Sequence, residues 1–121
     1  MRRAMVLGIL LAVGGLSSMA SQQPPPSGPT PASLAATKIE KVKDNLYMIT
    51  GSDPTDRSLF AGGNTGVFIT DTGVIVVDTK LTGWGQVILD KIKTVTNKPL
   101  TTIINTHFDH NSGNVEFSGH G

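Results

Sequence analysis

The chain has 121 residues, a formal net charge of +1, no cysteine, and 38% hydrophobic residues. Without cysteine it has neither disulfides nor thiolate ligands, so any metal would have to be held by imidazole and carboxylate groups. The charge is nearly balanced and shows no basic stripe, which argues against a nucleic-acid partner.

Residues 1–20 have the pattern of a secretory signal peptide. Arg2 and Arg3 precede an apolar run from Ala4 to Leu16, and Ser18-Met19-Ala20 has the small-x-small form of a cleavage site. The apolar run is shorter than the roughly 20 residues that span a bilayer. We therefore expect a periplasmic or secreted protein that is not attached to a membrane after cleavage. Loss of the two arginines leaves eight Lys and Arg against nine Asp and Glu.

Residues 21–37 are predicted to be a linker. The segment is rich in Pro, Ser, Gly and Thr, and Pro24-Pro25-Pro26 stands near its start. Such a composition buries little apolar surface and favours extended conformations. The folded domain is expected to occupy residues 38–121.

Two hairpins are predicted next. Residues 39–50 alternate loosely around a turn at Lys43-Asp44-Asn45. Residues 65–70 and 74–78 are β-branched runs on either side of Asp71-Thr72-Gly73, which makes this the clearer hairpin. Since Val74 to Val77 is apolar at every position, we expect a central strand covered on both faces.

A helix and a further strand follow. The helix is predicted from apolar residues at helical spacing, namely Trp84, Val87, Ile88, Ile92 and Val95. Thr82 is its expected N-cap, and Asn97-Lys98-Pro99 is expected to end it. Residues 100–105 form the next predicted strand. A strand–helix–strand unit indicates a crossover beside an otherwise antiparallel sheet.

The residues best suited to metal binding or catalysis lie in Thr106 to Asn114, directly after this strand. His107, Asp109 and His110 fall within four residues. Imidazole nitrogen and carboxylate oxygen are zinc ligands, and functional residues gather where a rigid strand gives way to a loop. The alternative is a solvated turn with incidental histidines.

The stretch from Gly63-Asn64-Thr65 through Val76-Val77-Asp78-Thr79 and the helix to Ile103–His107 resembles the metallo-β-lactamase superfamily. The resemblance covers residues 38–117. It implies an α/β fold, the αββα metallo-β-lactamase sandwich, of which this chain would be the N-terminal half. It also implies one or two Zn²⁺ ions and hydrolysis of a small-molecule amide, ester or thioester, with β-lactams among the candidate substrates.

The same resemblance implies roles for individual residues. Asp109 and His110 match the Asp-His pair that binds the second metal, and Asp109 would also orient the water that attacks the substrate. Asp78 matches an aspartate that ends a buried strand and supports the ligands without binding the metal. A plain turn carboxylate is the alternative for Asp78.

The chain departs from the family motif His-x-His-x-Asp-His, because it has one His before Asp109. Either Asn105 stands in the place of the first His, or His107 is the first His and an x-His pair is missing. The run Ile-Ile-Asn-Thr-His favours the second interpretation. Asn105 is then a neighbour of the ligands, since its carbonyl is a poor zinc ligand.

The family supplies further ligands from later loops, which this sequence does not contain. We therefore expect weak, partial zinc binding and little activity from this chain alone. The alternative to a hydrolase is a catalytically inactive fragment or binding domain with the same fold. Leu59 and Phe60, between the hairpins, are expected either to cover a substrate or to fold back onto the core.

Overall fold

The computed structural model describes residues 28–51, 53 and 55–119. The expected signal peptide over residues 1–20 lies outside these ranges. Among the described residues, no helix has the length and apolar character needed to cross a bilayer.

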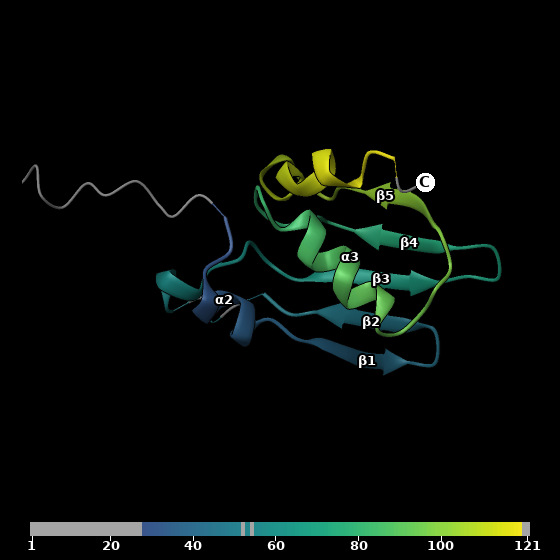
Figure 1. The fold of residues 1–121 in the computed structure, drawn as a ribbon, viewed down its shortest axis with the longest axis horizontal. Helices are drawn as coiled ribbons and strands as arrows, with labels where there is room; N and C mark the ends of the chain where they lie inside the picture. The colour runs from purple at the N-terminus through teal and green to yellow at the C-terminus, as the bar shows by residue number, and fades with distance from the viewer. Residues whose placement is uncertain (1–27, 52, 54, 120–121) are drawn as a thin grey trace, which may run out of the picture.

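The chain forms a mixed α/β structure built on one five-stranded sheet (Figure 1). The strands are β1 (Ile39–Lys43), β2 (Leu46–Ile49), β3 (Thr65–Ile69), β4 (Val74–Val77) and β5 (Leu100–Ile104). They are arranged in sequence order; the first three pairings are antiparallel and the last is parallel. Both predicted hairpins and the predicted crossover beside an antiparallel sheet are therefore confirmed.

The crossover helix α3 (Gly85–Lys93) packs on one face of the sheet. Its Ile88, Leu89 and Ile92 are buried against strand residues that include Val67 and Val76. Burial of these aliphatic side chains is the main force that holds the helix on the sheet.

The prediction that Thr82 is the N-cap of α3 is wrong. Trp84 occupies the cap position and is 1% exposed, but its side chain makes no capping hydrogen bond. A distant carboxylate provides the acceptors instead: Glu116 Oε1 accepts from Gly83 N (2.8 Å) and Glu116 Oε2 from Gln86 N (3.0 Å). This residue belongs to η3 (Ser112–Phe117), so a segment beyond β5 caps the helix.

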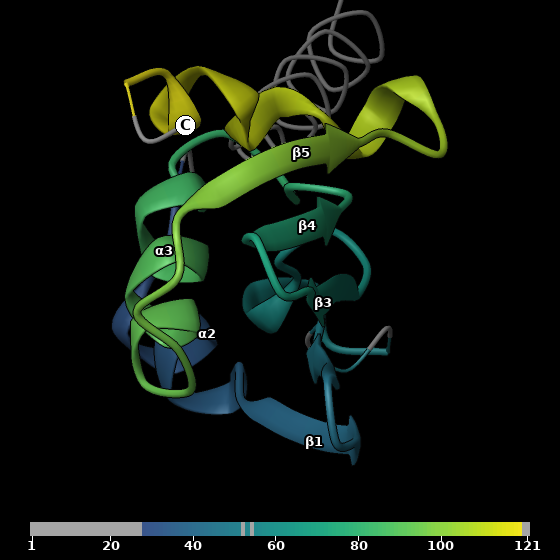
Figure 2. The same cartoon turned by 90° about the vertical axis from the view of Figure 1, so that its right-hand side faces the viewer.

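The expectation that β4 is covered on both faces is also wrong for the described residues. Val74 and Val76 are fully buried beneath α3, whereas Ile75 and Val77 are only partly buried. Figure 2 shows α2 and α3 on the same side of the sheet. From the strand registers, the apolar residues on the opposite side are Leu46, Met48, Phe68, Ile75, Val77 and Ile104. We call these six residues the outer face.

Part of the predicted extended linker is a helix, α2 (Pro31–Ala36). Thr30 accepts a hydrogen bond from Ser33 N (3.1 Å), and the Ser33 hydroxyl accepts one from Thr30 N (2.9 Å). This reciprocal capping, with proline at the first helical position, satisfies amide groups that a short helix otherwise leaves without partners. The composition of the segment concealed this local signal.

Candidate metal site

Two neighbouring strands deliver the candidate site. Asp78 directly follows β4, and its backbone N–H donates to Ile104 O (2.8 Å), the last residue of β5. His107 lies three residues beyond that point. Because β4 and β5 are parallel, their carboxyl ends meet at one edge of the sheet, which is where α/β proteins place their ligands.

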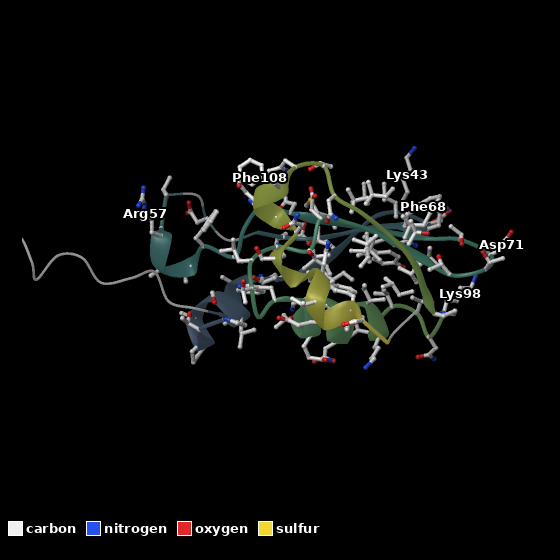
Figure 3. The ribbon with its side chains drawn as sticks, turned by 90° about the horizontal axis from the view of Figure 1, so that it is seen from above. Lys43, Arg57, Phe68, Asp71, Lys98 and Phe108 are labelled. Atoms are coloured by element: carbon white, nitrogen blue, oxygen red, sulfur yellow. The ribbon has the colours of Figure 1, made fainter. Side chains whose placement is uncertain are left out.

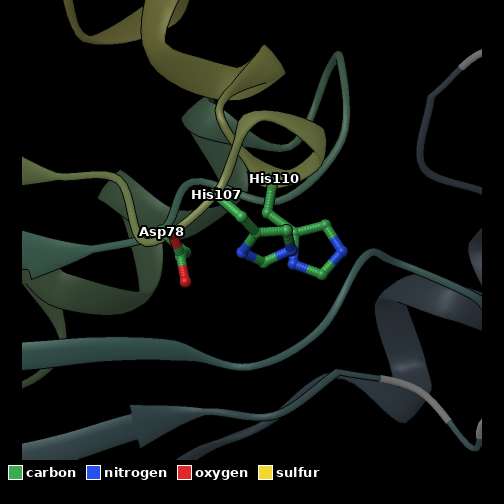
Figure 4. A group of neighbouring side chains, drawn as sticks. All are labelled: Asp78, His107 and His110. Atoms are coloured by element: carbon green, nitrogen blue, oxygen red, sulfur yellow. The ribbon is translucent and has the colours of Figure 1, made fainter.

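At this edge Asp78, His107 and His110 come together (Figure 4). One candidate ligand atom from each residue lies within 4.8 Å of those from the other two. The two imidazole centroids are 4.2 Å apart with the rings inclined by 63°. Asp78 is 8% exposed, His110 is partly buried and His107 is exposed, so the group opens to solvent on the His107 side.

The short helix η2 (Phe108–His110) lies between the two histidines. His107 is its N-cap, with an extended backbone (φ −157°, ψ 169°), and His110 is its last residue. The tight 3₁₀ turn keeps the path from one histidine to the other short. Both imidazoles lie beside the Asp78 carboxylate.

The donor set fits zinc. Two imidazoles and one carboxylate form the kind of three-residue protein ligand set found in catalytic zinc sites. Tetrahedral coordination with bonds near 2.05 Å separates ligand atoms by roughly 3.3 Å. The three ligand atoms fall within 4.8 Å of one another, so they would have to draw together by at most about 1.5 Å to coordinate an ion.

Thr106 links Asp78 to His107. Its backbone N–H donates to Asp78 Oδ1 (2.8 Å), and its hydroxyl donates to Asp78 Oδ2 (2.6 Å). The same hydroxyl oxygen lies 2.8 Å from His107 Nδ1. Since the only hydroxyl proton is directed at the carboxylate, Nδ1 must carry a proton and donate to Thr106. Nε2 of a neutral His107 then keeps its lone pair for a metal ion.

The surroundings of Asp78 favour its ionised form. Burial alone would raise the pKa of this carboxyl. The two hydrogen bonds from Thr106 and the nearby imidazoles of His107 and His110 act in the opposite direction, and together they lower the pKa below its ordinary value. A charged carboxylate is the form that binds metal ions.

The other predicted site residues lie outside this group. Asp109 is exposed, because one step along a 3₁₀ helix turns the side chain by about 120° from that of His110. Asn105 is also exposed, at the end of β5.

The neighbouring Phe108 is 80% exposed and projects on the side of the sheet opposite α3, as does Phe68 (Figure 3). Of the predicted lid residues, Phe60 is 48% exposed and Leu59 is partly buried.

Residues that follow Asp78 hold the histidine segment in place, and sequence reasoning missed them. Thr79 N donates to His110 O (2.8 Å), and the Thr79 hydroxyl donates to Asn114 Oδ1 (2.7 Å). Gly113 packs so closely here that a Cβ would lie 2.2 Å from Thr79 O. The one available signal was a run of polar residues directly after an entirely apolar strand.

No protein-family model matches this chain.

Proposed function

We propose that this chain carries the metal-binding part of an exported zinc-dependent hydrolase of the metallo-β-lactamase type, with an αββα sandwich. The observation that carries the proposal is the convergence of Asp78, His107 and His110 at the carboxyl edge of β4 and β5. A second support is the apolar outer face, which is the kind of surface that a second sheet layer covers in a sandwich. Export rests on the leader pattern in residues 1–20.

In this proposal the residues of the chain have distinct tasks. His107, through Nε2, and His110 would hold the ion together with the Asp78 carboxylate, and Thr106 would keep His107 in the required tautomer. When bound at such a site, zinc lowers the pKa of a coordinated water to about 7 and so supplies hydroxide at neutral pH. Asp109 is proposed, on the resemblance alone, to orient the attacking water, because its exposed side chain lies outside the ligand group.

The proposed substrates come from the resemblance and agree with this chemistry. A zinc-activated water can attack the polarised carbonyl of a small-molecule amide, ester or thioester, and β-lactams belong to this group. The site is open on the side of His107, and the 80% exposed Phe108 beside it offers an apolar contact to a substrate. No nucleophilic side chain of the protein is required.

A second candidate is a metal-binding domain without catalytic activity. Two observations favour it: the histidine motif is one imidazole short of the family pattern, and Asp109 lies outside the ligand group. Both candidates predict metal binding, but only the hydrolase predicts turnover that depends on Asp109.

The test is zinc titration of the purified protein by calorimetry, followed by assays with a chromogenic β-lactam, a thioester and a lactone. We expect weak binding that His107→Ala or His110→Ala abolishes and that Asp44→Asn, an exposed turn variant, leaves unchanged. Zinc binding that survives both histidine substitutions would refute the site. Hydrolysis lost in Asp109→Asn with zinc affinity retained would favour the enzyme, and binding without hydrolysis would favour the inactive domain.

A further inference from the structure

Lys80 is a fully buried lysine two residues beyond Asp78. Its relative exposure is 0%. Its backbone has a φ of +64°, in the left-handed region that residues other than glycine rarely adopt. Lysine is among the residues least often buried completely, and both features cost folding free energy. Their combination calls for a specific contact that only this side chain provides.

The contact is a bridge between the two ends of one loop. Lys80 Nζ donates to Thr50 O (3.0 Å), just after β2, and to Gly63 O (2.5 Å), just before β3. The ends of the loop also meet directly, because Gly51 N donates to Asn64 Oδ1 (2.7 Å). A single ammonium therefore fixes two backbone carbonyls that lie 13 positions apart in the sequence.

One of these carbonyls belongs to the residue that lies against His110. A Cβ added to Gly63 would stand 2.8 Å from Cε1 and 2.9 Å from Nδ1 of the His110 ring. The backbone of Gly63 thus packs directly against one side of the His110 imidazole. The main chain of His110 is held separately, through its carbonyl, by Thr79 N.

We propose that Lys80 is a positioning residue for His110. By fixing the Gly63 carbonyl, its buried ammonium keeps the Gly63 backbone against the imidazole, and this contact holds the ring toward Asp78 and His107. Lys80 is shielded from solvent, and its ammonium reaches the site through the Gly63 carbonyl, while its backbone separately pairs with Asn111. The inference rests on the proposed function in taking His110 as a metal ligand.

The absence of cysteine allows a precise chemical test. Lys80→Cys would carry the only thiol of the chain. Alkylation of the unfolded variant with 2-bromoethylamine and refolding gives a side chain almost identical to lysine, with its ammonium. Alkylation with 1-bromopropane gives a side chain of the same length without charge or donor. The two products differ only in the group that binds Thr50 O and Gly63 O.

Two readouts are needed, both on refolded protein whose urea midpoint has been measured. The first is zinc affinity by calorimetry, and the second is the imidazole ¹⁵N and ¹H NMR signals of His110 and His107 without metal. We expect the propyl product to bind zinc about tenfold more weakly than the aminoethyl product, as for other groups that orient metal ligands. We expect its His110 signals to move more than those of His107.

Lys98→Met is the matched control. Lys98 also donates to a backbone carbonyl, Thr70 O (2.6 Å), but it is exposed and lies beside the β3–β4 turn. This variant should keep the zinc affinity and the His110 signals of the parent. If the propyl product fails to refold, the unmodified Lys80→Cys protein takes its place in the comparison with the aminoethyl product, because the short cysteine side chain reaches neither Thr50 O nor Gly63 O.

The inference and the proposed function fail in different ways. Equal zinc affinity and equal His110 signals in the two alkylated products would overturn the positioning role of Lys80. Absence of zinc binding in the parent would overturn the proposed function instead. In that case the His110 signals of the metal-free products still decide whether Lys80 orients the ring.

Discussion

The hydroxyl of Thr106 lies between the Asp78 carboxylate and the His107 ring, 2.6 Å from Asp78 Oδ2 and 2.8 Å from His107 Nδ1. One proton cannot serve both neighbours, so the carboxylate determines which nitrogen of His107 is protonated. A residue at the end of β4 thereby sets the chemical state of a residue beyond β5. This relationship has a direct experimental consequence.

Thr106→Val should remove the hydroxyl and keep the β-branched shape. His107 then loses its partner at Nδ1, and we expect a mixture of tautomers and a zinc affinity lower by about tenfold. The ¹⁵N shifts of His107 report the tautomer, and calorimetry reports the affinity. Thr102→Val, at an exposed position of β5, is the control and should change neither quantity. A parent-like His107 spectrum in Thr106→Val would contradict the assigned hydrogen-bond direction.

Asp78 should make the fold sensitive to acid. Its pKa in the folded protein is lowered, chiefly because the hydrogen bonds from Thr106 and the nearby histidines outweigh burial. The unfolded chain therefore binds the proton more tightly, and the carboxylate contributes stability at pH values above the unfolded pKa of about 3.9. This contribution is lost as the pH falls through the lower, folded pKa.

The measurement is the urea unfolding free energy of the parent and of Asp78→Asn at pH 7 and near pH 3. We expect the parent to be the more stable of the two at pH 7 and the gap to narrow in acid. Asp71→Asn, in the exposed β3–β4 turn, is the matched control. A gap that stays constant between the two pH values would show that Asp78 contributes through shape alone.

Glu116 should stabilise the helix α3 from a distance. Its two carboxylate oxygens accept from Gly83 N and Gln86 N, amides that no helical carbonyl serves. Glu116→Ala should cost about 0.5–2 kcal/mol of unfolding free energy, the range measured for lost N-caps. Glu40→Ala, exposed on β1, should cost much less. Equal losses in the two variants, measured by urea denaturation, would argue against the cap.

Insertion of Thr-His between His107 and Phe108 should strengthen metal binding. The backbone at His107 is extended, with φ −157° and ψ 169°, so two added residues preserve the alternation of side chains. The insertion supplies a further imidazole beside the Asp78 group and produces the His-x-His-x-Asp-His spacing of the metallo-β-lactamase motif that this segment resembles. We expect tighter zinc binding by calorimetry at matched pH, because each added ligand couples binding to local order.

A control insertion of Thr-Ala at the same position separates the imidazole from the added length. It should bind zinc no more tightly than the parent. The Thr-His insertion could instead leave the zinc affinity unchanged or lower it. The short motif would then not be a shortened form of the longer zinc-binding motif, and the resemblance to that motif would lose its support.

The sequence by itself determined the strands, the crossover helix and the histidine segment. β-branched runs around Asp71-Thr72-Gly73 encode a hairpin locally, and apolar residues at helical spacing encode α3. His107 and His110 lie close in the chain, so their partnership needed only one 3₁₀ turn. Each of these features depends on neighbours within a few positions, which is the range over which sequence patterns are informative.

The tertiary structure decided everything that joins distant segments. Asp78 reaches the histidines only because β4 pairs in parallel with β5, and Glu116 caps α3 only because η3 folds back over its first turn. The sequence does not predict the burial of Lys80, because a lysine that follows a strand is ordinarily expected to be exposed to solvent. These contacts span 17 to 33 positions and arise from how the sheet edge brings its loops together, which no local pattern of residues records.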